Sequence, residues 1–281
     1  MNTLAFTKMH GLGNSYIYIE RQKNRHLSEK DLPGLAQAVA CPNTGIGSDG
    51  LITIEPSSIA SIKMRIFNKD GSEAKNCGNG LRCVAKYAFE NNLVSSSKMT
   101  IETISGIVEA HVEDSHVSIN MGAPRLCRQD LPMNGAPCDR IIAEPFSICG
   151  QKLQLTAISM GNPHAVFFVD TQHHNLHRTL GPQIEIDARF PEKTNVEFIW
   201  VENDHSLHMR VWERGSGVTQ ACGTGACAAL VAAVLNGFCK KNETVTVHLE
   251  GGKLEIVWLD TGAIMMKGPA VTVATGVFCY S

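Results

Sequence analysis

The chain repeats itself over most of its length, and this repeat limits what it can fold into. Three pairs of segments match in the same order, at offsets of 145 to 148 residues: 64–80 with 209–225, 99–124 with 245–270, and Gly13-Asn14 with Gly161-Asn162. The repeats of solenoid proteins recur about every 20–50 residues. A spacing near 145 residues therefore predicts two copies of one globular domain.

Each copy has the same order of local patterns. MRIFNKDGSEAKNCGNG (64–80) and MRVWERGSGVTQACGTG (209–225) both lead through a polar turn into Cys-Gly-x-Gly, and a helix-like run follows. The next segments alternate apolar and polar residues around a glycine-containing turn, which is typical of antiparallel hairpins. These patterns predict the α+β class, with many short strands and one cysteine-headed helix in each copy.

The repeat also predicts the domain boundaries. We expect an N-terminal domain over residues 1–121 and a C-terminal domain over residues 122–267. The remaining segment, 268–281, has a strand-like sequence. We expect it to pair with the first domain and complete it.

Composition excludes several classes of protein. The 25 basic and 27 acidic residues give a net charge of −2, without the basic excess that marks a nucleic-acid-binding domain. The amino-terminal segment lacks a basic head followed by an apolar run. The longest apolar run, 226–235, is far shorter than a membrane-spanning helix. We therefore expect a soluble cytoplasmic protein with no nucleic-acid or membrane partner, in which most of the ten cysteines are free and structural.

The two Cys-Gly-x-Gly segments have the chemistry of an anion site with a thiol at its rim. Each lies where a loop becomes a helix, so unpaired backbone N–H groups point outward from the helix end. Glycines let a ligand approach that backbone closely, and the helix dipole favours anions there. The same field is expected to lower the pKa of Cys77 and Cys222.

The duplication suggests how two such sites act together. Two similar domains can place both helix ends at one cleft, with a thiol on each side of the α-carbon of a bound amino acid. One cysteine, as thiolate, would remove the α-proton, and the other, as thiol, would deliver a proton to the opposite face. The amide groups would stabilise the negative charge that spreads onto the carboxylate. The pattern thus predicts an amino-acid racemase or epimerase.

Other interpretations of these cysteines are weaker. A single cysteine at a helix start is usually structural, but two in matching glycine contexts are not explained in that way. The spacings Cys77-x5-Cys83 and Cys222-x4-Cys227 do not fit a zinc site. The glycine pattern of dinucleotide-binding proteins is also missing. We therefore expect no metal and no cofactor.

The motifs resemble those of the diaminopimelate epimerase family, over essentially the whole chain. They are KMHGLGNS (8–15), TGIGSDG (44–50), RIFNKDGSEAKNCGNGLRC (65–83), MGNPH (160–164), FPEKTNVEF (190–198) and RVWERGSGVTQACGTGAC (210–227). The resemblance implies two similar domains, each a mostly antiparallel sheet or barrel around a central helix. It also implies pyridoxal-independent interconversion of LL- and meso-diaminopimelate, in lysine and peptidoglycan synthesis, by a homodimer.

The resemblance also assigns roles to individual residues. Cys77 and Cys222 correspond to the two catalytic bases, and Glu213 and His164 to polar partners near the reacting centre that tune them. The backbone cradles of the reacting carboxylate correspond to Gly78, Asn79, Gly223 and Thr224. The residues that hold the substrate, mostly its distal amino-acid end, correspond to Asn14, Asn68, Asn162, Asn195 and Arg214, with Glu213 close to them.

Several alternatives remain open on the sequence. Relatives of this fold racemise histidine or proline with the same two thiols, and a redox or binding module would instead use Cys77 and Cys222 as a regulatory disulfide. Glu213 could pair with a cation on a solvated face, and His164 could make only a local hydrogen bond. His173, His174 and His177 lie in a polar loop, where we expect exposed side chains rather than metal ligands.

Overall fold

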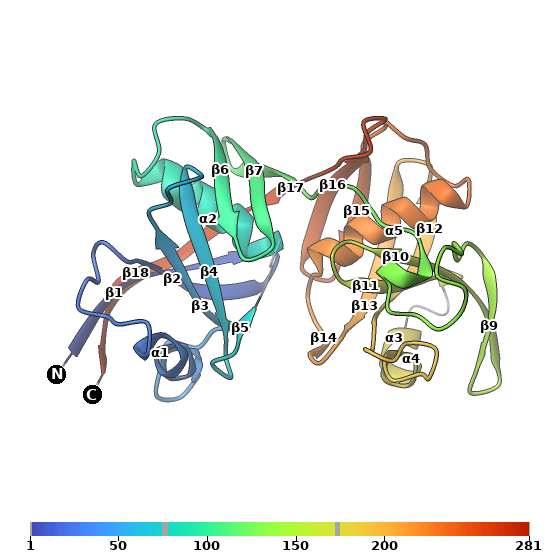
Figure 1. The fold of residues 1–281 in the computed structure, drawn as a ribbon, viewed down its shortest axis with the longest axis horizontal. Coiled ribbons are helices and arrows are strands. Elements are labelled where there is room, and N and C mark those ends of the chain that lie inside the picture. The colour runs from blue at the N-terminus through green and yellow to red at the C-terminus, as the bar shows by residue number, and fades with distance from the viewer. Residues whose placement is uncertain (1, 75–77, 172–174, 281) are drawn as a thin grey trace. The chain divides into compact units, whose positions relative to one another are not determined.

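The computed structural model of the chain describes residues 2–74, 78–171 and 175–280. The chain divides into two compact units. Unit 1 comprises Met1–Ile119 together with Gly268–Ser281, and unit 2 comprises Asn120–Lys267. Both units are drawn in Figure 1.

Unit 1 is built mainly from strands. Its elements are β1 (Asn2–Gly11), β2 (Asn14–Glu20), α1 (Asp31–Ala40), β3 (Gly50–Glu55), β4 (Ile62–Asn68), β5 (Glu73–Ala74), α2 (Gly78–Glu90), β6 (Lys98–Thr103), β7 (Gly106–Glu113), β8 (His116–Asn120) and β18 (Val271–Tyr280). Strands β2 and β3 are parallel, as are β4 and β6. The pairs β18–β1, β1–β2, β3–β4, β6–β7 and β7–β8 are antiparallel.

Unit 2 repeats this order. Its elements are a 3₁₀ turn (Arg128–Asp130), β9 (Glu144–Ile148), β10 (Gln151–Ser159), β11 (Pro163–Phe168), α3 (Leu176–Thr179), α4 (Gly181–Glu185), β12 (Asn195–Asn203), β13 (Ser206–Glu213), β14 (Gly217–Val218), α5 (Gly223–Leu235), β15 (Val245–Leu249), β16 (Gly252–Trp258) and β17 (Ile264–Pro269). Strands β11 and β12 are parallel, as are β13 and β15. These are the counterparts of the two parallel pairs of unit 1.

The shared topology confirms the predicted fold class, an α+β architecture from an internal duplication. Helices α2 and α5 both have 13 residues and begin at equivalent glycines, Gly78 and Gly223. The predicted hairpins are β6–β7 and β15–β16, which turn at equivalent glycines. Gly106 has φ +124° and Gly252 has φ +137°, a region that favours glycine because other residues carry a Cβ.

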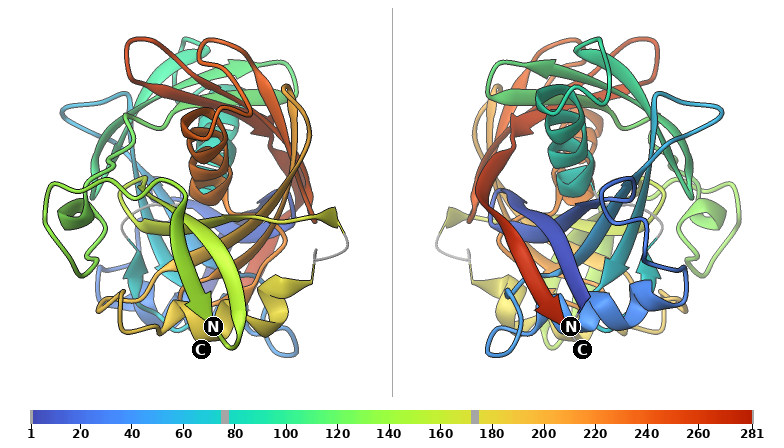
Figure 2. Two further views of the ribbon diagram at one scale, coloured as in Figure 1. Left: turned by 90° about the vertical axis from the view of Figure 1, so that its right-hand side faces the viewer. Right: turned by 90° about the vertical axis from the view of Figure 1, so that its left-hand side faces the viewer.

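One helix lies at the centre of each unit. In α5 every residue from Gly225 to Ala233 is buried, as expected for a helix that is apolar all round. It packs against β10, β11, β12, β13, β15 and β16. In unit 1, α2 contacts β1, β2, β4, β6 and β7. Figure 2 shows α5 (orange) in one view and α2 (teal) in the other, each with strands of its own unit around it.

Strand β18 closes the sheet of unit 1 on one side. It pairs with β1 from Asn2↔Tyr280 to His10↔Val271. Along most of its length its residues are exposed, including Val271, Val273 and Val277. Among the described pairings it has no second neighbour, and its Phe278 and Tyr280 pack against the core of unit 1.

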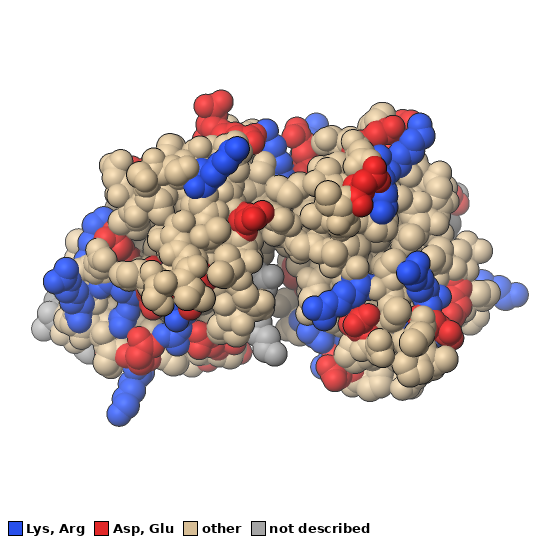
Figure 3. Space-filling model, turned by 45° about the horizontal axis from the view of Figure 1, so that its top comes forward, with Lys and Arg blue, Asp and Glu red and all other residues tan. Residues whose placement is uncertain are grey.

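No helix in the described parts of the chain is both long and apolar enough to span a bilayer. Charged side chains of both signs lie close together on the face shown in Figure 3, over each unit. Arg65–Glu73 and Arg128–Glu144 are examples of ion pairs between partly exposed side chains. This surface agrees with the small net charge of the chain.

Candidate active site

The predicted site residues fall into two groups, one in each unit. Unit 1 carries Asn14, Asn68, Gly78 and Asn79, and unit 2 carries Asn162, His164, Asn195, Glu213, Arg214, Cys222, Gly223 and Thr224. Cys77 lies outside the described residues, directly before α2. Of the two predicted catalytic cysteines, Cys222 is the one within the described residues.

Cys222 is the N-cap of α5. Its backbone is extended (φ −116°, ψ 110°), and its Sγ accepts a hydrogen bond from the backbone N–H of Gly225 at 3.3 Å. The Thr224 hydroxyl lies 3.5 Å from the same sulfur. Cys222 thus takes the capping role usually filled by Ser, Thr, Asp or Asn. The thiol is fixed at the positive end of the helix, as the Cys-Gly-x-Gly pattern predicts.

Gly225 leaves room for this arrangement. A Cβ on Gly225 would lie 2.7 Å from Glu197 Oε1 and 3.2 Å from Cys222 Sγ. Both distances are shorter than ordinary van der Waals contacts, so the glycine lets a carboxylate and a thiol approach the same turn of helix.

The pKa of Cys222 is raised well above its usual value, contrary to the sequence-based expectation. The main cause is burial, followed by the negative charges of Glu213 and Glu197. Hydrogen bonds from Thr224 and Gly225 lower the pKa but do not compensate. The helix end alone suggested a thiolate, but desolvation disfavours the charged form. Burial and the two nearby carboxyl groups thus favour the protonated thiol of Cys222 over the thiolate.

Glu213 is partly buried and lies next to Cys222, not on a solvated face. Burial raises the pKa of its carboxyl. Hydrogen bonds from the hydroxyl of Thr219 and from the thiol of Cys222 act in the opposite direction. A carboxyl group with a raised pKa beside a thiol is suited to exchange a proton with it.

His164 and Glu197 form a fully buried pair. Their side chains are 0% exposed, and His164 Nδ1 lies 2.6 Å from Glu197 Oε1. Burial raises the pKa of Glu197, whereas the adjacent His164 lowers it. The other ring nitrogen, Nε2, lies 3.1 Å from Asn162 Oδ1. Asn162 Nδ2 in turn donates to Thr224 Oγ1 at 3.3 Å. A continuous polar chain thus runs from Glu197 to Cys222.

Glu197 was not among the predicted site residues. The signal for it was a single acidic residue in a buried strand, between Val196 and Phe198 in β12. Ionisable residues are seldom fully buried unless they are paired. His164, 33 residues away, lies directly beside it because β11 and β12 are parallel, with His164 in register with Asn195.

Asn195 and Arg214 connect neighbouring loops in unit 2. Asn195 is buried, and its side chain donates to the Pro163 carbonyl at 2.8 Å and accepts from the Arg214 backbone N–H at 3.0 Å. The Arg214 guanidinium donates to the Glu192 carbonyl at 3.0 Å. These bonds hold Asn195 in position, while the exposed Arg214 keeps further donors.

The unit 1 residues also lie in hydrogen-bonded turns. Asn14 donates to Asp49 Oδ2, and Asn68 donates to Ser72 Oγ, both at 3.0 Å. Asn79 is buried at the start of α2 and accepts from Arg82 at 2.8 Å. Arg82 is itself fully buried and bonds the Pro269 carbonyl. The start of α2 is therefore held by side chains from within the unit.

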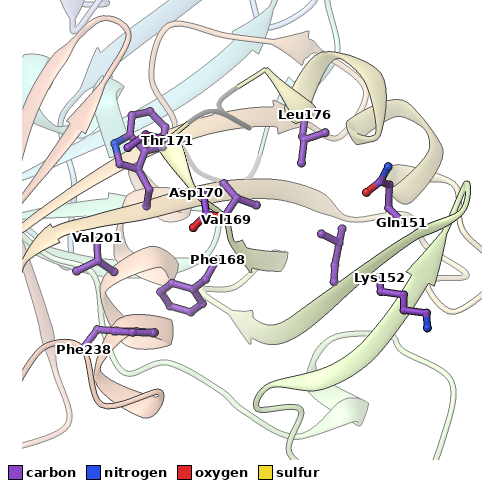
Figure 4. Close-up of a pocket in the computed structure, with 11 residues that line it drawn as sticks. Gln151, Lys152, Phe168, Val169, Asp170, Thr171, Leu176, Val201 and Phe238 are labelled. Carbon is purple, nitrogen blue, oxygen red and sulfur yellow. The ribbon is translucent and has the colours of Figure 1, made fainter.

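Two other features of unit 2 lie apart from these residues. The pocket in Figure 4 is lined by residues that include Phe168, Val201 and Phe238, but by none of the predicted site residues. His177 is buried with 1% exposure, so the expectation that it is exposed was wrong. It lies in α3, which packs against β12 and β13. His173 and His174 lie outside the described residues.

Comparison with known proteins places this geometry in one family. The sequence model of a family described as diaminopimelate epimerase matches residues 6–127 and 156–273. The diaminopimelate epimerase of Geobacillus kaustophilus (strain HTA426) is 58% identical over 285 residues, covering 100% of this chain and 98% of that protein. The diaminopimelate epimerase of Geobacillus sp. (strain WCH70) is 56% identical over 285 residues, and the match covers 100% of both proteins.

Solved structures share the fold at much lower identity. A Bacillus anthracis phenazine biosynthesis protein of the PhzF family matches with a TM-score of 0.72 at 16% identity, covering 100% of both chains. A hydroxyproline epimerase from Agrobacterium vitis matches with a TM-score of 0.68 at 14% identity, covering 99% of this chain and 91% of that one. The fold is thus shared more widely than the sequence motifs, and on those motifs the chain belongs to the diaminopimelate epimerase family.

Proposed function

We propose that this protein interconverts LL- and meso-diaminopimelate by proton transfer at one α-carbon, in lysine and peptidoglycan synthesis. The observation that carries the proposal is Cys222, a buried thiol that caps α5 beside Glu213. Relatives 54–58% identical over the whole chain are named diaminopimelate epimerase. This agreement favours diaminopimelate over histidine or proline as the substrate.

The proposed reaction moves one proton off the substrate and another onto it. Cys77, as thiolate, would take the α-proton and become a thiol. Cys222, as thiol, would donate its proton to the opposite face of the same carbon and become a thiolate. The raised pKa of Cys222 supports its role as the proton donor in this direction. The reverse reaction exchanges the two roles.

The backbone at the helix starts would hold the reacting carboxylate. The first N–H groups of a helix have no intrahelical acceptor, so those near Gly78 and Gly223 can donate to an anion. Such donors stabilise negative charge that grows in the transition state. No step in this scheme requires a metal or an organic cofactor.

The distal amino-acid group of the substrate would be held by the polar side chains that the resemblance assigns. They are Asn14, Asn68, Asn162, Asn195 and Arg214. A guanidinium can bind a carboxylate bidentately, and an amide side chain both donates and accepts. Substrates that lack the distal carboxylate would leave these groups unpaired.

The experiment that tests the proposal is α-proton exchange in D2O, followed by NMR on reduced protein. LL-diaminopimelate is compared with L-histidine, L-proline and L-glutamate. Exchange and epimerisation of diaminopimelate alone are expected. Exchange with another amino acid would identify that amino acid as the substrate, and the two-thiol mechanism would still stand. No exchange with any of them would favour a redox or binding role for the thiols.

The pH dependence of kcat/KM should reflect the ionisation of the Glu213 carboxyl. If ionised Glu213 is needed to accept a proton from Cys222, activity falls as pH drops through the pKa of that carboxyl. The Thr219 hydroxyl lowers this pKa, so Thr219→Val should raise it. The acidic limb of kcat/KM against pH should then move to higher pH. Thr246→Val, on β15 of the same unit, is the matched control. An unchanged acidic limb would separate Glu213 from the proton transfer.

We further propose that the protein works in the cytoplasm as a homodimer that associates through β18. The exposed valines on this strand support the dimer, with Val273 54% and Val277 64% exposed, because monomers seldom leave such apolar surface uncovered. Val277→Lys should convert dimer to monomer, as measured by light scattering. Thr272→Lys, on the same strand, is the control. A dimer that persists in Val277→Lys would place the interface elsewhere.

A further inference from the structure

We propose that unit 2 contains a site for a divalent transition-metal ion, formed by Glu202, His208 and His248. One ligand atom from each residue lies within 4.8 Å of the other two. The three residues come from β12, β13 and β15, and none belongs to the active-site groups described above. The site is therefore separate from the thiol chemistry.

Strand pairing brings the three side chains together. His208 and His248 are directly opposite each other on the parallel strands β13 and β15. On the other side, His208 is in register with Trp200 of β12. Glu202 lies two residues beyond Trp200, where the register shifts between Val201 and Asn203. Residues two apart on a strand face the same side, so Glu202 lies on the face of Trp200.

Stacking holds the imidazole rings in place. The centroids of His208 and His248 are 4.5 Å apart with an interplanar angle of 14°. Trp200 stacks on the other face of His208 at 4.9 Å and 7°. The indole thus restricts the ring next to it, so less rotational entropy is lost when that ring binds an ion.

The donor distances suit a small ion. Glu202 Oε2 lies 3.3 Å from His208 Nε2. Zinc–nitrogen and zinc–oxygen distances near 2.0–2.2 Å place neighbouring tetrahedral donors about 3.3 Å apart. This pair already has that spacing, and a rotation of His248 would bring in the third donor. The Glu202 side chain is 55% exposed and that of His208 28%, so an ion can enter from solvent.

The hydrogen bonds of Ser206 indicate which atoms carry hydrogens in the metal-free site. Its hydroxyl donates to Glu202 Oε2 at 2.6 Å, and its Oγ lies 3.1 Å from His248 Nε2. Because the hydroxyl hydrogen goes to the carboxylate, His248 Nε2–H is the donor in the second bond. His208 Nε2–H likewise donates to Glu202. A bound ion would replace both Nε2 hydrogens, each neutral ring then carrying its proton on Nδ1.

Two imidazoles and one carboxylate favour zinc and related transition metals over magnesium or calcium, which prefer oxygen ligands. Other histidine–carboxylate pairs in the described residues offer fewer metal ligands. His111 lies 2.9 Å from Glu113, and His205 lies 3.7 Å from Glu243. Each of these pairs has one imidazole, so His111 provides a matched control.

The test is titration of the metal-free protein with zinc chloride, after its thiols have been blocked with N-ethylmaleimide. Calorimetry should show one ion per chain, and the imidazole ¹⁵N resonances of His208 and His248 should shift. His208→Gln and His248→Gln should each weaken binding at least about tenfold, because losing even an outer-shell partner costs about 10- to 100-fold. His111→Gln should leave the affinity unchanged.

A second readout does not depend on counting ions. Zinc that binds only the folded state raises the melting temperature, so it should do so in the parent protein and in His111→Gln. The increase should be absent in the doubly substituted His208→Gln, His248→Gln protein, whose circular dichroism should match the parent. Equal zinc affinity in that double variant, or imidazole resonances that do not move, would overturn the proposal.

Discussion

Cys222→Ala is expected to lower kcat/KM for diaminopimelate by about 10²–10⁴-fold, the range contributed by one positioned proton donor or acceptor. Exchange of the substrate α-proton with D2O should separate the two half-reactions. Without Cys222, Cys77 can still take a proton from one face, but nothing returns one to the other face. Epimerisation should therefore fall further than α-proton exchange, measured with the isomer whose α-proton lies on the Cys77 side. Cys77→Ala should show the same loss with the other isomer.

Cys239→Ala is the control for this prediction. Cys239 is also buried in unit 2, and burial raises its pKa to about 11. It is not at a helix start, so its loss should affect packing and leave turnover intact. Equal activity in Cys222→Ala and the parent protein would contradict the two-thiol mechanism. Denaturation curves would show whether either variant has lost stability.

Glu197→Ala is expected to cost about 1–3 kcal/mol of unfolding free energy, the usual effect of leaving a buried hydrogen-bonding group without its partner. His164 has no exposed surface, so water cannot replace the lost carboxylate at Nδ1. The polar chain through Asn162 and Thr224 would also lose its fixed end. Urea denaturation measures the stability, and kcat/KM measures the effect on Cys222.

Glu197→Gln separates charge from shape. The amide oxygen can still accept from His164, so this variant should cost only about 1 kcal/mol, the value of one altered hydrogen bond. Glu255→Ala, at an exposed position on β16, should have little effect. If Glu197→Ala were as stable as Glu255→Ala, the buried pair would not contribute to the fold.

The sequence predicts most of the fold because each pattern can be checked against its counterpart in the other copy. A pattern that occurs twice, such as Cys-Gly-x-Gly before a helix, distinguishes a structural requirement from chance. The equivalent starts of α2 and α5 confirm that reasoning. The chemistry was harder to predict where it depends on pairing between strands. Glu197 meets His164, and Glu202 meets His248, only after β11, β12, β13 and β15 align.

The protonation state of Cys222 illustrates a different limit. A helix start and two glycines are local features, and they indicate a lowered pKa. Burial and the charges of Glu197 and Glu213 are not local, and they dominate. The sequence shows where the thiol lies along the chain, whereas its proton affinity depends on the residues that pack around it.

The pairing of β1 with β18 has a consequence for folding during synthesis. Figure 1 shows the marked N and C ends close together, and the register joins Asn2 to Tyr280. Unit 2 is continuous in sequence, so it can fold while the chain is still emerging from the ribosome. Unit 1 must wait for its last strand, with β1 unpaired on that side. Contacts so distant in sequence form slowly, and a strand edge that stays unpaired in the newly made chain is prone to aggregation.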